Sequence, residues 1–180
     1  MIKKLSYFVF LVFSITCISS CSIKNEKEIK SVEELSIKVK LLKSTFESIT
    51  MDDVQFAKQT YKINMDKITK YHNSDTMDYE VSHTLNLYKG IKKTGENLHE
   101  NHRNNKKNIE LLISQLEKLK LDIEGNAIPT DSIQAFIDFE TKNITKLSDD
   151  IGTFVTDCED ILEIHDTYAE KVRGYTVAFN

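Results

Sequence analysis

The segment His99-Glu100-Asn101-His102 contains residue types that bind metal ions. It looks like a zinc-protease motif, but that motif needs two histidines four residues apart, and these two are three apart. On a helix, residues three apart share a face, so His99 and His102 are candidate metal ligands. The interpretation we favour is that both are exposed polar side chains. The pair by itself therefore does not define a metal centre.

Two copies of the pattern Glu-x-x-His, at Glu80 to His83 and at Glu96 to His99, are typical of di-iron helical bundles. Such sites need the two copies on different, facing helices. Here they are 16 residues apart on one predicted helix, which separates them by about 24 Å. They cannot share a metal centre, so we predict neither a cofactor nor a catalytic residue from them.

The N-terminal segment has the organisation of an export signal. Lys3 and Lys4 precede an apolar run over residues 5–18 that is too short to span a membrane. The run ends in Ile18-Ser19-Ser20-Cys21, which is an aliphatic residue, two small residues and a cysteine. This pattern resembles the lipobox of bacterial lipoproteins. The resemblance covers residues 1–21 and bears on nothing beyond them.

The resemblance implies a lipid anchor on Cys21. The thiol would receive a diacylglyceryl group and the chain would be cut before it, so that 1–20 is a signal peptide and 21–27 a lipidated tether. Several acyl chains then retain the protein at the membrane, where one chain would be marginal. Ser22 implies sorting to the outer membrane in a Gram-negative host. The alternatives are an uncleaved anchor or a plain signal peptide.

The remaining cysteine, Cys158, would be the one free thiol of the mature protein, because Cys17 leaves with the signal and Cys21 is acylated. An intramolecular disulfide is then excluded. Cys158 falls on an apolar helical stripe, so we predict a small buried hydrophobic side chain.

Charge argues against a nucleic-acid partner. The chain carries 24 basic and 28 acidic residues; without Lys3 and Lys4 the balance is 22 to 28, a net charge of −6. Nucleic-acid binding needs a basic face, and electrostatic attachment to a membrane needs basic residues too. We therefore expect membrane attachment through the lipid alone.

Apolar periodicity predicts an all-α fold with three long helices, over residues 28–72, 76–124 and 130–173. The third shows the clearest stripe, in steps of four and three, and Gly174 is its expected stop. Its stripe residues are Ile133, Ile137, Glu140, Ile144, Leu147, Ile151, Phe154, Cys158, Ile161, His165, Tyr168 and Val172. Asp131 and Gln134 are expected to form a capping pair, and 175–180 is a C-terminal tail.

Equal lengths and short connections predict an elongated up-down-up bundle over residues 28–174, with coiled-coil-like packing. The helix midpoints fall near residues 50, 100 and 151, where the stripes are interrupted by polar residues or glycine. We predict a polar, loosely packed level there. The alternative is that the helices break at these points into a shorter bundle of four or five helices.

Two segments, Asp75-Thr76-Met77 and Asp131-Ser132-Ile133, resemble the O-glycosylation acceptor pattern of Bacteroidetes. Both stand at predicted helix starts, where Asp, Ser and Thr are common caps, and we interpret them as caps.

The sequence predicts a non-catalytic helical interaction or structural module, held in the cell envelope by lipid and contacting a protein partner. It is not expected to be an enzyme, because no motif identifies a reaction. The alternative is a small-molecule or metal-binding lipoprotein in which several mid-level side chains converge: His99, His102, Asp52, Asp53, Asp149 and Asp150.

Overall fold

The computed structural model describes residues 25–71 and 77–177, and this part of the chain is all-α, with no strand. The helices are α2 (Glu26–Glu47), α3 (Met51–Tyr71), α4 (Tyr79–Tyr88), α5 (Gly90–Thr94), α6 (Leu98–Glu124) and α7 (Thr130–Val177). The predicted signal peptide, the lipobox with Cys21, Asp75, Thr76 and the last three residues lie outside the described ranges.

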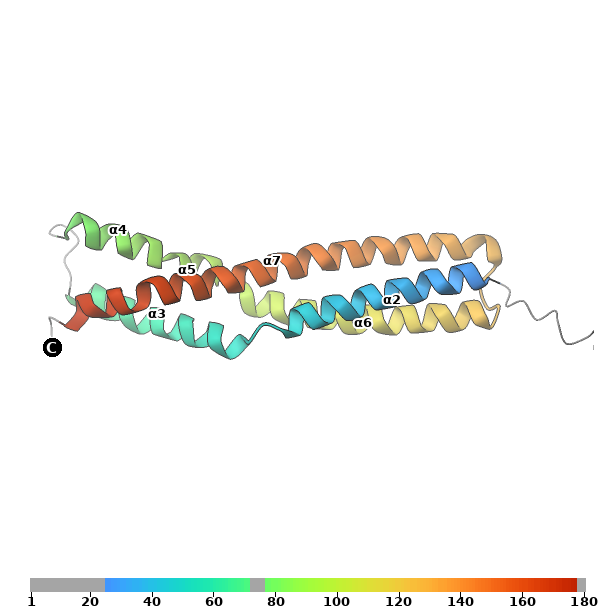
Figure 1. Cartoon of the computed structure of the whole chain (residues 1–180), viewed down its shortest axis with the longest axis horizontal. Helices are drawn as coiled ribbons and strands as arrows, with labels where there is room; N and C mark the ends of the chain where they lie inside the picture. The colour runs from blue at the N-terminus through green and yellow to red at the C-terminus, as the bar shows by residue number, and fades with distance from the viewer. Residues whose placement is uncertain (1–24, 72–76, 178–180) are drawn as a thin grey trace, which may run out of the picture.

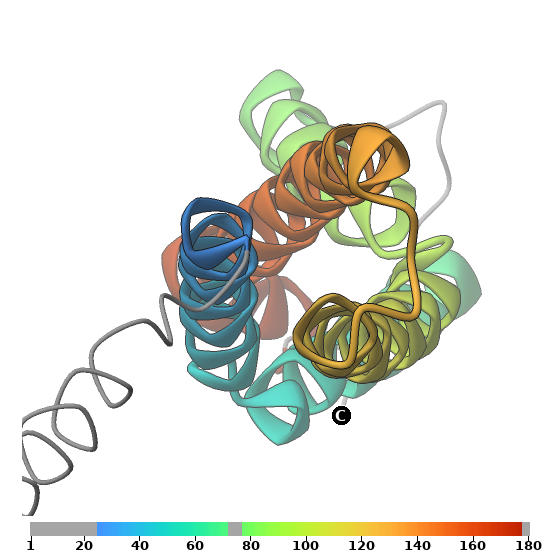
Figure 2. The ribbon, with the colours of Figure 1, turned by 90° about the vertical axis from the view of Figure 1, so that its right-hand side faces the viewer.

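The helices form an elongated rod, and the chain runs along it three times (Figure 1). Helices α2 and α3 run outward in succession, α4, α5 and α6 return, and α7 covers the whole length again (Figure 1). Viewed from the end where α2 begins, α2, α6 and α7 surround a common axis (Figure 2). The prediction of a helical bundle is confirmed.

Helix α7 provides the spine because its apolar stripe is buried along almost its full length. Ten of the twelve predicted stripe residues are buried, including Glu140, whose carboxylate accepts a hydrogen bond from Asn143 at 3.3 Å. His165 and Tyr168 are half-buried, and Ala169 takes the buried position instead. The buried face therefore rotates slightly in the last turns of α7.

The first run of the chain breaks where the sequence pattern slips. Helix α2 ends at Glu47, and the hydroxyl of Ser48 donates to the carbonyl of Thr45 at 2.7 Å. Helix α3 begins at Met51 with Asp52 and Asp53 in its first turn, where carboxylates interact favourably with the helix dipole. The interruption predicted near residue 50 is a true break between two helices.

The second run consists of three helices, so the prediction of one helix over 76–124 is wrong. Breaks occur at Lys89 and at residues 95–97. At Gly90 the chain passes so close to α7 that an added Cβ would lie 2.8 Å from Cδ1 of Ile164. At Gly95 an added Cβ would lie 2.8 Å from the carbonyl oxygen of Ile91. A larger residue at Gly95 would press on backbone, whereas at Gly90 the end of the Ile164 side chain would have to move.

The third run is continuous, so the break considered near residue 151 does not occur. Ile151 is 1% exposed and anchors α7 in the core. Gly152 faces open space, with no atom within 4 Å of an added Cβ. Helix α7 also continues to Val177, past the stop predicted at Gly174. The broken helices follow one another along α7, and the bundle is therefore not shortened.

The turn before α7 has the predicted position. The amide of Gly125 donates to the Leu121 carbonyl, and Asn126 takes the left-handed conformation with φ 52°. The predicted capping pair of Asp131 and Gln134 is wrong, because Gln134 donates to Asp138 at 2.8 Å.

Burial of the α7 stripe generates a stability prediction. Ile144 is 5% exposed, whereas its neighbour Thr145 is exposed. Ile144→Asp should lower the free energy of unfolding by more than about 3 kcal/mol, because it buries an unpaired charge. Thr145→Asp should change it by less than about 1 kcal/mol. Urea unfolding followed by circular dichroism measures both, and equal losses would contradict the assignment of the buried face.

Candidate functional site

The two candidate metal ligands make separate contacts. The Nε2 atom of His99 lies 2.9 Å from Oε1 of Gln55 on α3, in an exposed position. The ring of His102 stacks on Phe46, with ring centroids 4.9 Å apart. Within residues 25–71 and 77–177, no three His, Cys, Asp or Glu side chains lie close enough to hold a metal ion. Asp52, Asp53, Asp149 and Asp150, which the metal-site hypothesis needed, are exposed.

The middle of the rod contains an aromatic junction, formed by Phe46 of α2, His102 of α6 and Phe154 of α7. The Phe46 and Phe154 centroids are 5.2 Å apart, and those of His102 and Phe154 are 5.7 Å apart. Both phenylalanines are buried. Each of the three runs contributes one ring to this cluster, and a hollow of about 270 Å³ lined by Phe46 and His102 lies beside it. The polar, loosely packed level stays a prediction.

Asn105 follows the junction by one turn of α6 and is buried, with 3% of its surface exposed. Its Nδ2 donates to the carbonyl oxygen of Asp150 at 3.4 Å. A buried amide without a partner would be costly, so this bond offsets the loss of hydration. Asn105 thus fixes α6 against α7 beside the junction.

The surroundings of His102 favour its neutral form. Burial lowers the pKa of the imidazole below its usual 6.5, and the charges of Lys106 and His99 lower it further. Between the lowered pKa and about pH 6.5, His102 is therefore protonated more in the unfolded chain than in the folded chain. The free energy of unfolding is highest above this pH window and decreases as the pH falls through it.

Cys158 is fully buried, which confirms its predicted role as a small core residue. Burial raises the pKa of its thiol from 9.0 to about 11, and the nearby charges of Asp157 and Glu159 act in the same direction. Since the thiolate is the reactive form, this sulfur is chemically inert in the folded protein.

In the half of the rod away from the start of α2, a buried polar cluster joins three helices. Asn64 of α3 donates to the hydroxyl of Tyr88 at 3.3 Å and to the carbonyl of Ala169 at 3.4 Å. The rings of Tyr61 and Tyr88 lie 5.2 Å apart, and burial raises the pKa of both phenols. Asn64 is buried, with 4% of its surface exposed, whereas the neighbouring Met65 is half-buried.

Next to this cluster lies a cleft of about 940 Å³ between α3 and α5. We call it the lysine cleft, because five lysines line it: Lys58, Lys62, Lys89, Lys92 and Lys93. Both α3 and α5, which form its walls, also pack against α7. Sequence reasoning missed this site, since its lysines come from separate helices.

One lysine of the cleft has a structural role. The ammonium of Lys58 donates to the carbonyl oxygen of Gly95 at 2.7 Å, at the C-terminal end of α5. Helix ends leave carbonyls unpaired, and a cation there is favoured by the helix dipole. The absence of a side chain at Gly95 permits this contact, because an added Cβ would lie 3.1 Å from Cε of Lys58.

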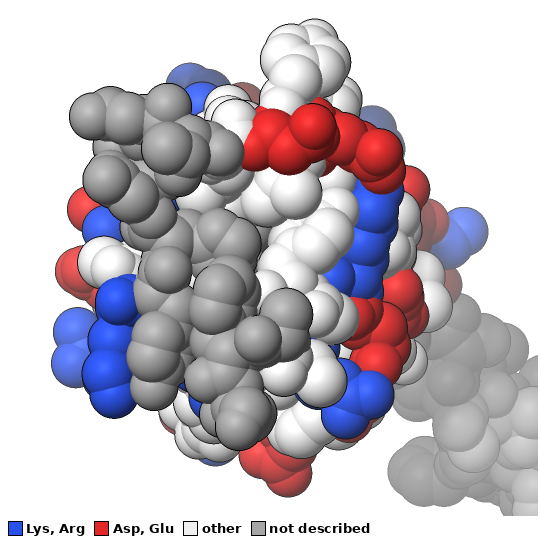
Figure 3. Space-filling model, turned by 90° about the vertical axis from the view of Figure 1, so that its left-hand side faces the viewer, with Lys and Arg blue, Asp and Glu red and all other residues white. Residues whose placement is uncertain are grey.

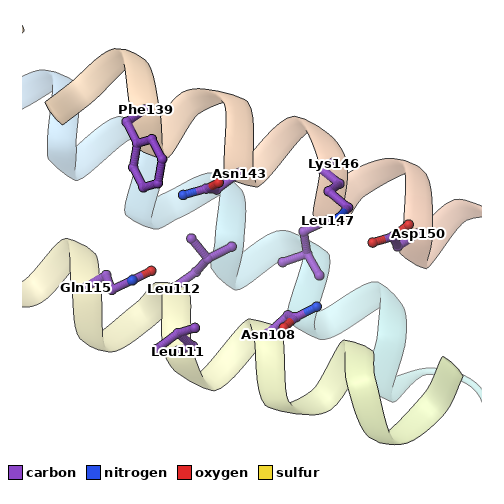
Figure 4. Close-up of a pocket in the computed structure, with 9 residues that line it drawn as sticks. All are labelled: Asn108, Leu111, Leu112, Gln115, Phe139, Asn143, Lys146, Leu147 and Asp150. Atoms are coloured by element: carbon purple, nitrogen blue, oxygen red, sulfur yellow. The ribbon is translucent and has the colours of Figure 1, made fainter. Parts of the chain in front are cut away.

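Smaller hollows lie in the other half of the rod. One of about 220 Å³ separates α6 from α7, with Leu112 and Leu147 between the helices and polar side chains around them (Figure 4). Another, of about 380 Å³, lies between α2 and α7 and is lined by Leu42 and Ile144 among others. Neither brings together a set of like charges comparable to the lysine cleft.

His102 generates a prediction about pH. The melting temperature should fall between about pH 7.5 and about pH 5, because protonation of His102 is disfavoured in the folded state. His102→Phe keeps an aromatic ring at the junction and should flatten this dependence. Thermal unfolding of both proteins across the range measures the difference. Identical pH dependence would show that His102 titrates as freely in the folded chain as in the unfolded one.

Cys158 generates a prediction about reactivity. Iodoacetamide at neutral pH should leave the thiol unmodified in the folded protein and alkylate it after denaturation in urea, because both burial and the raised pKa withhold the thiolate. Mass spectrometry of the peptide that contains Cys158 reads the result. Rapid alkylation of the native protein would contradict a closed core at this level of α7.

No protein-family model matches this chain, and no curated protein or solved structure shows significant similarity to it. Of the helices in the described ranges, none has the combination of length and low charge needed to cross a membrane.

Proposed function

We propose that the protein is a lipid-anchored, non-catalytic interaction module of a bacterial cell envelope. The observation that carries this proposal is the lysine cleft, a cavity of about 940 Å³ whose cationic side chains belong to two separate helices. Its volume lies within the range of small-molecule pockets, so the proposal of a larger partner depends on the spread of its lysines over separate segments of the chain.

The position of the cleft along the rod supports an anchored module. Helix α2 begins at Glu26, five residues after Cys21, and an extended chain of five residues spans at most about 18 Å. Acyl chains on Cys21 would hold this end of the rod close to a membrane. Lys58 lies a further 32 residues along the rod, which corresponds to roughly 48 Å of helix. The rod would present the cleft well away from the lipid surface.

The anchored half of the rod is proposed to pack as a coiled coil. The α7 stripe advances in alternating steps of four and three from Ile133 to Ile161, which is the repeat of knobs-into-holes packing. Helices α2, α6 and α7 all contact one another in this half. A closed three-helix rod supports the role of a spacer, because it resists bending between the anchor and the cleft.

The anchor is tested by Cys21→Ala. We expect the variant to accumulate as unprocessed precursor without acyl chains, because acyl transfer requires the thiol. Metabolic labelling with a fatty acid and fractionation of membranes measure both effects. Cys158→Ala is the matched control and should be labelled and retained like the parent. A Cys21→Ala protein that is processed and retained normally would refute the lipoprotein assignment.

The interaction role is tested in intact cells with a photoreactive amino acid placed at exposed apolar positions. Leu41, Leu87 and Leu121 are 64%, 41% and 66% exposed. We expect discrete protein adducts from at least one site, and loss of those adducts in the Cys21→Ala background. Illumination that yields no adduct at any of the three sites would contradict an interaction module.

A further inference from the structure

The lysine cleft carries an inference about the chemistry of the partner, which rests on the proposed function. We propose that the cleft binds an acidic segment of a polypeptide, with carboxylates directed to the lysines and apolar side chains between them.

Four lysines of the cleft have no acidic partner of their own. Lys62, Lys89, Lys92 and Lys93 are exposed and form no ion pair with any described residue. Lys89 lies three and four residues before Lys92 and Lys93, so like charges are neighbours on one face and repel one another. A bound anion would relieve this repulsion.

The floor of the cleft is largely apolar. Half-buried Tyr61 and Met65 of α3 provide apolar surface there, above Ile91, which is fully buried. The wall of α3 extends from Lys58 to Thr69, about 16 Å along the helix. A length of this order accommodates several residues of a peptide. An apolar floor with a cationic rim is complementary to a segment in which acidic and apolar side chains alternate.

The distribution of charge disfavours a dense polyanion such as nucleic acid. Asp66 and Glu96 also line the cleft and would repel closely spaced phosphates. Between Gly152 and Val177, α7 carries six acidic and two basic residues. Acidic and basic side chains surround an uncharged centre on the visible part of the end of this half (Figure 3). Spaced carboxylates can contact the lysines without approaching these acids.

The acidic stretch of α7 also makes a second copy of this chain a competing occupant. Contact between the cleft of one copy and α7 of another would be heterologous and would extend into open assemblies. We favour a separate polypeptide, because the apolar lining of the cleft needs apolar side chains, and Val177 is the one exposed apolar side chain in residues 152–177 of α7.

The test compares two charge reversals in the full-length lipidated protein in detergent. Lys62→Glu with Lys92→Glu reverses two lysines of the cleft. Lys107→Glu with Lys118→Glu makes the same change at exposed positions of α6. The probe is a fluorescein-labelled peptide of Glu, Ala and Leu with Glu at every third or fourth residue, and its counterpart has Lys in place of Glu. Fluorescence anisotropy measures binding.

We expect the Glu peptide to bind the parent, and the cleft reversal to weaken that binding by at least about tenfold. The α6 reversal should change it by less than about twofold, and the Lys peptide should not bind. Affinity should fall as salt rises, because the contacts are solvent-exposed. Circular dichroism verifies folding. If the variant with Lys62→Glu and Lys92→Glu does not fold, Lys62→Gln with Lys92→Gln replaces it. Binding of the Glu peptide is then expected to weaken as well.

Several results would overturn the inference. These are no binding of the Glu peptide, equal losses in the two reversals, or displacement of the peptide by polyphosphate at much lower charge concentration than by polyglutamate. Sedimentation that shows a self-assembly abolished by the cleft reversal would assign the cleft to a second copy. If the photoadducts persist unchanged in the cleft reversal, the protein still has an interaction role, but the cleft is not its binding site.

Discussion

The apolar stripe of α7 must be covered along its entire length. The helix has 48 residues and is therefore about 72 Å long, and no other helix in the described ranges is much more than half as long. Two successive sets of helices cover it: α2 with α6 in one half, and α3 with α4 and α5 in the other. Because α7 is continuous, every break falls in the covering helices, and each half adopts its own cross-section.

The change from one set to the next creates helix ends in the middle of the rod, which need partners. The hydroxyl of Ser48 and the ammonium of Lys58 both bind carbonyl oxygens at such ends. The rings of Phe46, His102 and Phe154 fill the space between the three runs. His102 is neutral in this setting, since burial lowers its pKa. A polar residue therefore serves as an aromatic one, which the sequence pattern alone did not indicate.

The features that were predictable from sequence are those determined by local periodicity. Steps of four and three located the buried face of α7, and the register slip near Thr50 located a break. Gly152 was misleading, because a glycine on the exposed face costs at most about 1 kcal/mol and burial of Ile151 and Phe154 outweighs it. The break at Lys89 lies beside the close approach of Gly90 to Ile164 of α7, a contact that only the folded chain brings together. The lysine cleft is likewise tertiary, while the lipid anchor on Cys21 stays a prediction from sequence.

The two halves of the rod differ in a way that bears on function. In the half that begins at Glu26, each of α2, α6 and α7 contacts both of the others, so the triangle is closed. In the other half, α3 and α4 meet mainly through side chains, in the cluster of Asn64, Tyr61 and Tyr88, and the backbones remain apart. The cleft itself lies between α3 and α5, and Lys89, Lys92 and Lys93 stand beside the breaks at Lys89 and at residues 95–97. Under the function we propose, this half presents its cationic side chains to a partner, while the half closed by α2, α6 and α7 serves as the spacer.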